Sequence, residues 1–313
     1  MRVLAANADA RGQLEIALLL PLLDSQSGDN ANARKQALAR ARDLSGQEAL
    51  VAWLEARDCG NTPACDARAA FQRLQDIEPD NAAAWLLELE HLLQPVPASD
   101  AITDAQRLDL LRKAAQADRY DDHLTDTSRE TLLALASVAL PPLDPQTEAG
   151  LRKLQHFGAD ASRDELRSAF VASMATAMDI PSYASISGLC SVDRALAAQS
   201  PWLAPCRAVY GRMADGDSLI AQLQGRTRMV LLHPTGADAA HWREQLRQSH
   251  WLMASFSRAM SPAAIVAIRE IGEVPALRAE LARRGESEPP PDWLPQSPRA
   301  LALITTGQLP AKP

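Results

Sequence analysis

The residues with the clearest potential for chemistry belong to two short motifs. The tetrapeptide GDSL begins at Gly216 and carries Ser218, and Asp238 and His241 follow with Asp-x-x-His spacing. A serine hydroxyl is a weak nucleophile until a neighbouring base takes its proton and a carboxylate orients that base. The side-chain types for acyl transfer are therefore present, and the surrounding elements decide whether they can meet.

This pattern resembles the GDSL hydrolases, which place the serine directly after a buried β-strand near the start of an α/β domain. Here Ser218 follows the helical segment CRAVYGRMA at 206–214, and only 19 residues separate it from Asp238. That distance is too short for the intervening βα units. Asp215 or Asp217 instead reads as the N-cap of a helix. We therefore expect no catalytic residue here and interpret the motif as a helix start.

The remaining polar residues indicate no metal or nucleotide site. The histidines at 91, 123, 156, 233, 241 and 250 include no H-E-x-x-H motif, and we interpret each as a surface or cap residue. Neither G-x-G-x-x-G nor G-x-x-x-x-G-K-[ST] occurs, so nucleotide cofactors have no binding loop. We expect no cofactor and no metal ion.

The four cysteines form two local pairs, Cys59 with Cys65 and Cys190 with Cys206. Four cysteines permit three connectivities, and proximity favours this one. Zinc sites use C-x2-C or C-x4-C spacing with a second ligand pair, whereas the spacings here are x5 and x15. We predict two disulfides, with free core thiols and metal ligation as the weaker alternatives. Disulfides persist in oxidising compartments, so we expect a periplasmic or otherwise exported protein whose signal peptide is absent from this chain.

Most of the chain has the apolar spacing of amphipathic helices, and β-branched runs are almost absent. The predicted helices span 9–23, 31–43, 46–58, 65–77, 82–93, 103–117, 127–139, 146–157, 161–179, 191–199, 203–214, 217–233, 237–260, 262–271 and 273–284. Short helices joined by short turns predict an all-α array of antiparallel helix hairpins.

We expect three regions along this array. An N-terminal helical-repeat region covers 1–140, and a C-terminal helical region continues it over 141–285. The tail at 286–313 is rich in proline, which removes backbone donors and fixes φ, so we expect it to be extended. Trp293 is expected to pin this tail to the helices rather than to present it as a free recognition peptide. Trp251 lies off the core stripe of its helix and is expected either to widen that stripe or to meet a partner.

One part of the chain has a repeated pattern. Trp53 and Trp85 lie 32 residues apart, each within an Ala-Trp-Leu sequence. Between them Ala67 and Phe71 have A-x3-F spacing, and Pro79 follows. Alanine permits close helix approach, phenylalanine fills the space between helices, and proline ends one helix before the next begins.

These residues resemble the tetratricopeptide repeat, a helix-turn-helix unit of about 34 residues. The resemblance covers about residues 48–118. It implies an α-α superhelix of degenerate repeats with a concave surface that binds peptides or protein segments.

Composition narrows the choice of partner. The formal net charge of −7 argues against nucleic acid, which needs a basic face. No run of 18 apolar residues occurs, so we expect no membrane span. Lysine occurs only four times and arginine supplies the other cations, a bias typical of a GC-rich bacterial genome.

The sequence thus favours a non-catalytic protein-binding or scaffold protein of the bacterial cell envelope, with a protein or peptide partner. A periplasmic immunity or inhibitor protein against a secreted toxin is one alternative. An enzyme whose active site is assembled from distant helices is the other.

Overall fold

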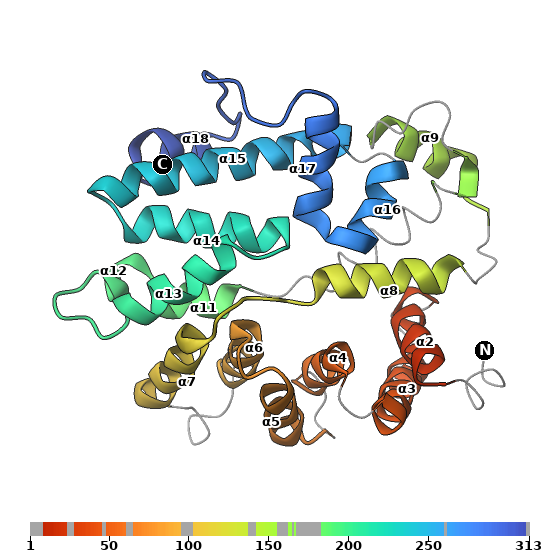
Figure 1. The fold of residues 1–313 in the computed structure, drawn as a ribbon. Coiled ribbons are helices and arrows are strands. Elements are labelled where there is room, and N and C mark those ends of the chain that lie inside the picture. The colour runs from red at the N-terminus through yellow and green to blue at the C-terminus, as the bar shows by residue number, and fades with distance from the viewer. Residues whose placement is uncertain are drawn as a thin grey trace. The chain divides into compact units, whose positions relative to one another are not determined.

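The computed structural model describes residues 9–23, 28–45, 48–60, 65–94, 103–136, 142–154, 162–164, 166, 183–259 and 262–310. Within these ranges the regular structure is α-helical, and the one β-type pairing is an isolated bridge between Asn81 and Arg119. The predicted all-α fold of packed neighbouring helices is confirmed (Figure 1). The helix expected at 161–179 lies almost wholly outside the described residues. No helix in the described part of the chain is long and apolar enough to cross a membrane.

The chain divides into two units, each made of three separate stretches. Unit 1 comprises Met1–Pro79, Asp122–Pro181 and Ser261–Glu270, and unit 2 comprises Asp80–Asp121, Ser182–Met260 and Ile271–Pro313. The units therefore do not follow the contiguous division at 140 and 285 that the sequence suggests. The reason is that helices distant in sequence pack together within each unit, α2 with α8 in the first and α7 with α13 in the second.

Unit 1 is built on the amphipathic helices of the first half of the chain. It contains α2 (Ala10–Leu23), α3 (Gly28–Ser45), α4 (Ala49–Gly60), α5 (Ala67–Ile77), α8 (Leu124–Ala136), α9 (Pro145–Leu154) and most of α16 (Pro262–Ile271). Helix α2 packs against α3 and α8, α3 against α4, and α4 against α5. Leu19 of α2 meets Ala134 and Leu135 of α8 in one buried cluster.

A proline inside α2 requires a compensating contact in this unit. Pro21 has no N–H, so the carbonyl of Ala17, four residues earlier, loses its helical donor. Arg34 of α3 supplies the missing donor, because its Nη1 donates to Ala17 O at 3.2 Å. Its Nε also donates to Asp58 Oδ2 at 2.6 Å. One buried arginine thus joins α2, α3 and α4.

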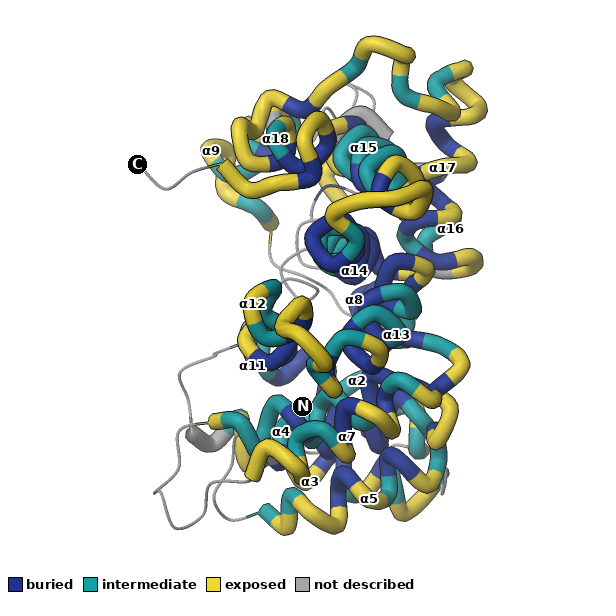
Figure 2. The backbone as a smooth tube through the Cα atoms, turned by 90° about the vertical axis from the view of Figure 1, so that its left-hand side faces the viewer, coloured by how far each residue is buried: buried dark blue, intermediate teal, exposed yellow. Residues whose placement is uncertain are grey.

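Unit 2 is arranged around α14. It contains α6 (Ala82–Leu92), α7 (Asp104–Gln116), α11 (Ala184–Leu189), α12 (Val192–Ala195), α13 (Leu203–Ala214), α14 (Leu219–Leu232), α15 (Ala237–Ala259), α17 (Glu273–Arg283) and α18 (Pro298–Thr306). Helix α14 packs against α13 and α15 and also contacts α12 and α18, which leaves none of its residues exposed (Figure 2). Two apolar clusters hold these helices; one joins Leu219 to Val274 and Leu277, and the other joins Leu246 to Leu303.

The expectation of an extended tail over 286–313 is wrong for Pro298–Thr306, which form α18. Ser297 caps this helix by accepting a hydrogen bond from Ala300 N, and Pro298 occupies the first helical position, where its missing N–H costs nothing. Gly307, with φ of 74°, ends the helix in the left-handed region. Helix α11, over 184–189, is also absent from the predicted set. Both are short helices whose apolar residues fill fewer than three turns.

Candidate functional site

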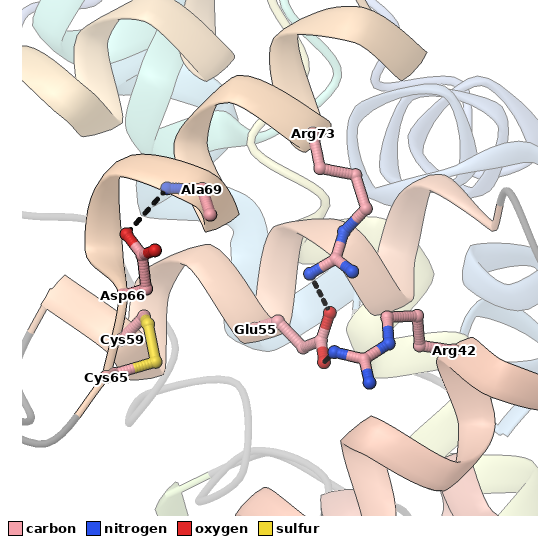
Figure 3. The surroundings of a disulfide bond; sticks show 7 residues. All are labelled: Arg42, Glu55, Cys59, Cys65, Asp66, Ala69 and Arg73. Atoms are coloured by element: carbon pink, nitrogen blue, oxygen red, sulfur yellow. Dashed lines mark hydrogen bonds and ion pairs between the residues drawn. A yellow bond between two sulfur atoms is a disulfide. The ribbon is translucent and has the colours of Figure 1, made fainter.

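Both cysteine pairs predicted from the sequence are at bonding distance. Cys59 near the end of α4 bonds Cys65 just before α5, with the two Cα atoms 5.2 Å apart (Figure 3). Asp66 follows at once and caps α5, since its side chain accepts a hydrogen bond from Ala69 N at 3.0 Å. The second pair joins α13 to the end of α11, with Cα atoms 5.7 Å apart. The first disulfide therefore clamps the turn of the α4–α5 hairpin.

A partly buried carboxylate lies one turn of α4 away from that clamp. Glu55 pairs with Arg42 of α3 and Arg73 of α5, so three helices meet at one side chain (Figure 3). Burial raises the pKa of Glu55, and the two guanidinium groups oppose that rise. Both arginines remain about one-third exposed while the carboxylate is 12% exposed. The carboxylate of Glu55 is thus paired within the fold, and its two ion pairs link α4 to α3 and α5.

A second cluster of titratable groups in unit 1 is centred on His123. Its Nε2 lies 2.7 Å from Glu78 Oε2, and its Nδ1 lies 3.5 Å from Asp126 Oδ2. The ring also contacts Trp53, with centroids 5.3 Å apart. The side chains of His123 and Glu78 are 3% and 5% exposed, and that of Asp126 is 31% exposed. An imidazole between two carboxylates has the group types of an acid–base relay.

Helix ends position this cluster. Glu78 is the C-cap of α5, and its N–H donates to Leu74 O at 2.8 Å. His123 has a φ of 53°, in the left-handed region, and its carbonyl accepts the first bond of α8 from Thr127 N at 2.8 Å. Asp126 lies in the first turn of α8, where the helix dipole favours a negative charge. The cluster thus links the end of α5 to the start of α8.

The electrostatics of the cluster agree with this linking role. The pKa of the Asp126 carboxyl is lowered, mainly by its hydrogen bond with His123. Burial of Asp126 raises this pKa, and the Arg129 guanidinium, 2.7 Å away, lowers it further. The side chains of Glu78 and His123 are almost fully buried, whereas that of Asp126 is partly exposed. The expectation of a surface or cap histidine is therefore half correct, because His123 begins α8 but is buried. No local motif signals this pair, whose members are 45 residues apart.

The GDSL segment begins a helix in unit 2. Ser218, rather than Asp215 or Asp217, is the N-cap of α14: its Oγ accepts a hydrogen bond from Ala221 N at 3.1 Å, and the residue is 3% exposed. Helix α14 then rises about 20 Å, at 1.5 Å per residue, before a short loop leads into α15. His241 lies in the second turn of α15, near that loop and at the opposite end of α14 from Ser218. The serine and the histidine are thus held apart by the length of a helix.

Comparisons with known proteins add no assignment to this geometry. No family model, curated protein or solved structure matches the chain. The contacts of the chain's own residues therefore carry the functional argument. At Ser218 and at His123, two places where nucleophilic or acid–base groups lie, those contacts cap or join helices.

Proposed function

We propose that this protein is a non-catalytic binding or scaffold protein of the bacterial cell envelope, which binds a protein or peptide segment on its helical surface. The observation that carries the proposal is the use of its potentially reactive side chains in the fold. Ser218 caps α14, and His123 is buried against Glu78. A surface whose reactive groups are engaged internally offers shape, charge and apolar contact, which are the means of recognition rather than of catalysis.

The helix hairpins support this proposal. In unit 1 α4 packs against α5, and in unit 2 α6 packs against α7. Phe71, the aromatic of the A-x3-F pattern, is 2% exposed, and Trp53 of α4 is equally buried. Pro79 follows the end of α5, as the tetratricopeptide pattern requires. We therefore propose a tetratricopeptide-like origin for these hairpins, and such hairpins present side chains to peptide segments.

The proposed compartment is the periplasm. Two disulfides, Cys59–Cys65 and Cys190–Cys206, account for all four cysteines. Reducing cytosolic conditions keep thiols reduced, whereas the periplasm oxidises them. The net charge of −7 favours a neutral or basic partner. An immunity or inhibitor protein that binds a basic secreted toxin is one specific form of this proposal.

Affinity capture tests the proposed function. The tagged chain is used as bait in periplasmic extract, and a helical periplasmic protein of matched net charge serves as the control bait. Mass spectrometry is expected to identify a protein enriched by the chain and not by the control. Repeated capture without an enriched protein contradicts the proposal.

The compartment has its own test. Thiol labelling of the denatured, unreduced protein, isolated from periplasm, is expected to modify none of the four cysteines. Labelling of all four after expression with an export signal contradicts the periplasmic assignment.

A further inference from the structure

The proline-rich segment after α17 forms a turn against α15. Trp293 N donates to Pro290 O at 3.0 Å, which closes a four-residue turn with Pro291 and Asp292 at its centre. Arg247 of α15 donates from Nη1 to Pro290 O at 2.9 Å and to Trp293 O at 3.4 Å. A guanidinium from one helix thus binds both ends of the turn.

Aromatic and ionic contacts complete this arrangement. The ring of Trp293 meets the ring of Trp251 edge-on, with centroids 5.2 Å apart. Glu244 holds the guanidinium of Arg247 in place through two hydrogen bonds of 2.8 and 2.9 Å. Arg247 and Trp251 are four residues apart and therefore lie on the same face of α15. This pair, with Glu244 behind it, is a prearranged site for a turn.

The centre of the turn is exposed to solvent, in contrast to the packed helices on either side. Pro290, Pro291 and Asp292 are exposed, so their docking buries little surface. Before the turn, α17 ends in a closed cap in which Glu286 N donates to Leu281 O at 2.8 Å. After it, α18 is fixed by its own buried residues, including Leu303. Both flanking helices thus have packing contacts of their own, which do not depend on the turn.

The contacts that hold the turn are not unique to this sequence. Arg247 binds two main-chain carbonyls, which any peptide in the same turn presents, and Trp251 accepts any aromatic edge. We propose that Arg247 and Trp251 form a docking site for a partner's proline-containing turn that ends in tryptophan, and that the chain's own turn fills this site when the partner is absent. This inference rests on the proposed binding function and names the partner segment.

Charge decides which segment competes best. The chain's own segment at 286–298 is acidic, with Glu286, Glu288 and Asp292 around the turn. The whole protein is also negative, so a partner segment with basic flanks is attracted and one with neutral flanks is not repelled, whereas the acidic segment of the chain itself is repelled. The tethered turn has the advantage of an effective concentration in the millimolar range. A partner must therefore overcome that advantage through its flanks.

A peptide in trans tests the site directly. The probe is a fluorescein-labelled 13-residue copy of residues 286–298 in which both glutamates are replaced by glutamine. Fluorescence anisotropy measures its binding to the full chain. The variant Trp293→Ala, which weakens the resident turn, is expected to bind the probe about tenfold more tightly than the unaltered chain. A probe with alanine in place of tryptophan is expected to bind neither.

The variant Arg247→Gln, made in the Trp293→Ala background, is expected to reduce probe binding about tenfold, since it removes a charged donor to two carbonyls. The matched control is Arg278→Gln, because Arg278 is exposed on α17 and is expected to leave binding unchanged. Circular dichroism checks that each variant is folded. If Trp293→Ala disturbs the fold, Pro291→Gly loosens the turn without touching the tryptophan pair.

Two results overturn the inference: equal probe affinity for the unaltered and the loosened chains, including no binding to either, and full binding after loss of Arg247. The outcome is separable from that of the proposed function. Probe binding without any captured partner contradicts the function alone. A captured partner whose binding is insensitive to Arg247→Gln contradicts the docking site alone.

Discussion

The close packing of α13 against α14 depends on one glycine. A Cβ atom placed on Gly225 of α14 lies 2.4 Å from the backbone N of Ala214, 2.7 Å from the carbonyl O of Tyr210 and 2.8 Å from the carbonyl C of Met213. All three are backbone atoms of α13, which cannot turn aside as a flexible side chain does. Alanine at position 225 therefore forces the two helices apart.

The magnitude follows from that displacement. Moving the nearest contact from 2.4 Å to an ordinary separation of about 3.4 Å requires a shift of about 1 Å, which sacrifices much of the dispersion energy along the interface. The same shift stretches the 3.1 Å hydrogen bond from Arg226 Nε to Ala214 O. Overpacking of this kind costs about 1–3 kcal/mol, and loss of a buried charged hydrogen bond adds about 1.5 kcal/mol. Alanine also has a higher helix propensity than glycine, which offsets about 1 kcal/mol of this loss. We therefore expect Gly225→Ala to lower the free energy of unfolding by about 1.5–3.5 kcal/mol.

The neighbouring helix provides a matched control. Gly211 lies in α13, and a Cβ placed on it meets only Met229 Cε, at 4.0 Å. Gly211→Ala is expected to raise the free energy of unfolding by about 0.5–1 kcal/mol, through the same gain in helix propensity. Urea unfolding followed by circular dichroism measures both variants. The reasoning is refuted if Gly225→Ala matches the unaltered chain, or if both variants lose the same stability.

Three further outcomes are expected. Ser218→Ala should lower the free energy of unfolding by about 1 kcal/mol through loss of the α14 cap, with no change in ester hydrolysis by the purified chain; abolition of a measurable esterase activity would contradict the structural role. Folding lowers the pKa of Asp126 below its ordinary 3.8, so the stability it contributes is present above that pH and is lost as pH falls through the lowered value. The stability gap between the unaltered chain and Asp126→Asn, about 1–2 kcal/mol at pH 7, should therefore close below about pH 4 in unfolding titrations, and a constant gap would argue against it. Arg34→Met should lower the free energy of unfolding by about 1 kcal/mol less in the Pro21→Ala variant than in the unaltered chain, because alanine at position 21 restores an N–H donor for Ala17 O. If urea unfolding shows that the effects of the two changes simply add, this coupling is refuted.

Local patterns in the sequence predict much of this structure. The predicted helix at 203–214 and the predicted start at 82 coincide with α13 and α6, because apolar spacing and the Asp80–Asn81 turn act within a few residues. The cysteine pairs were predictable for the same reason, since each closes a short loop. Helix α18 was missed because its prolines suggested an extended tail, although Ser297, Pro298 and Gly307 are ordinary cap residues.

The pairing of Glu78 with His123 has no such local signal. It depends on the end of α5 meeting the start of α8, and 45 residues separate the two side chains. The left-handed backbone at His123 is equally unmarked: histidine adopts that conformation more often than most residues, but still at only a small minority of positions. Local sequence patterns therefore predict the helices, whereas the contacts between helices distant in sequence are seen only in the folded chain.

The excess of arginine over lysine also acquires a structural meaning. Arg212 donates to Ala117 O after α7 at 2.8 Å, Arg226 donates to the last carbonyl of α13, and Arg207 donates to the last carbonyl of α14. These C-terminal carbonyls lack partners within their own helices and lie at the negative end of the helix dipole.

A guanidinium suits this role because its planar fork of five donors reaches several oxygens at once, which a lysine ammonium on a flexible stem does not. Arg226 also reaches Gln245 O and Ser249 Oγ of α15. Burial lowers the pKa of Arg226 to about 10, and the like charge of Arg278 adds to that effect. The side chain still carries its proton at neutral pH and so remains a cation facing the dipole of α13. The positions of these residues show that the fold uses arginine to join the ends of its helices.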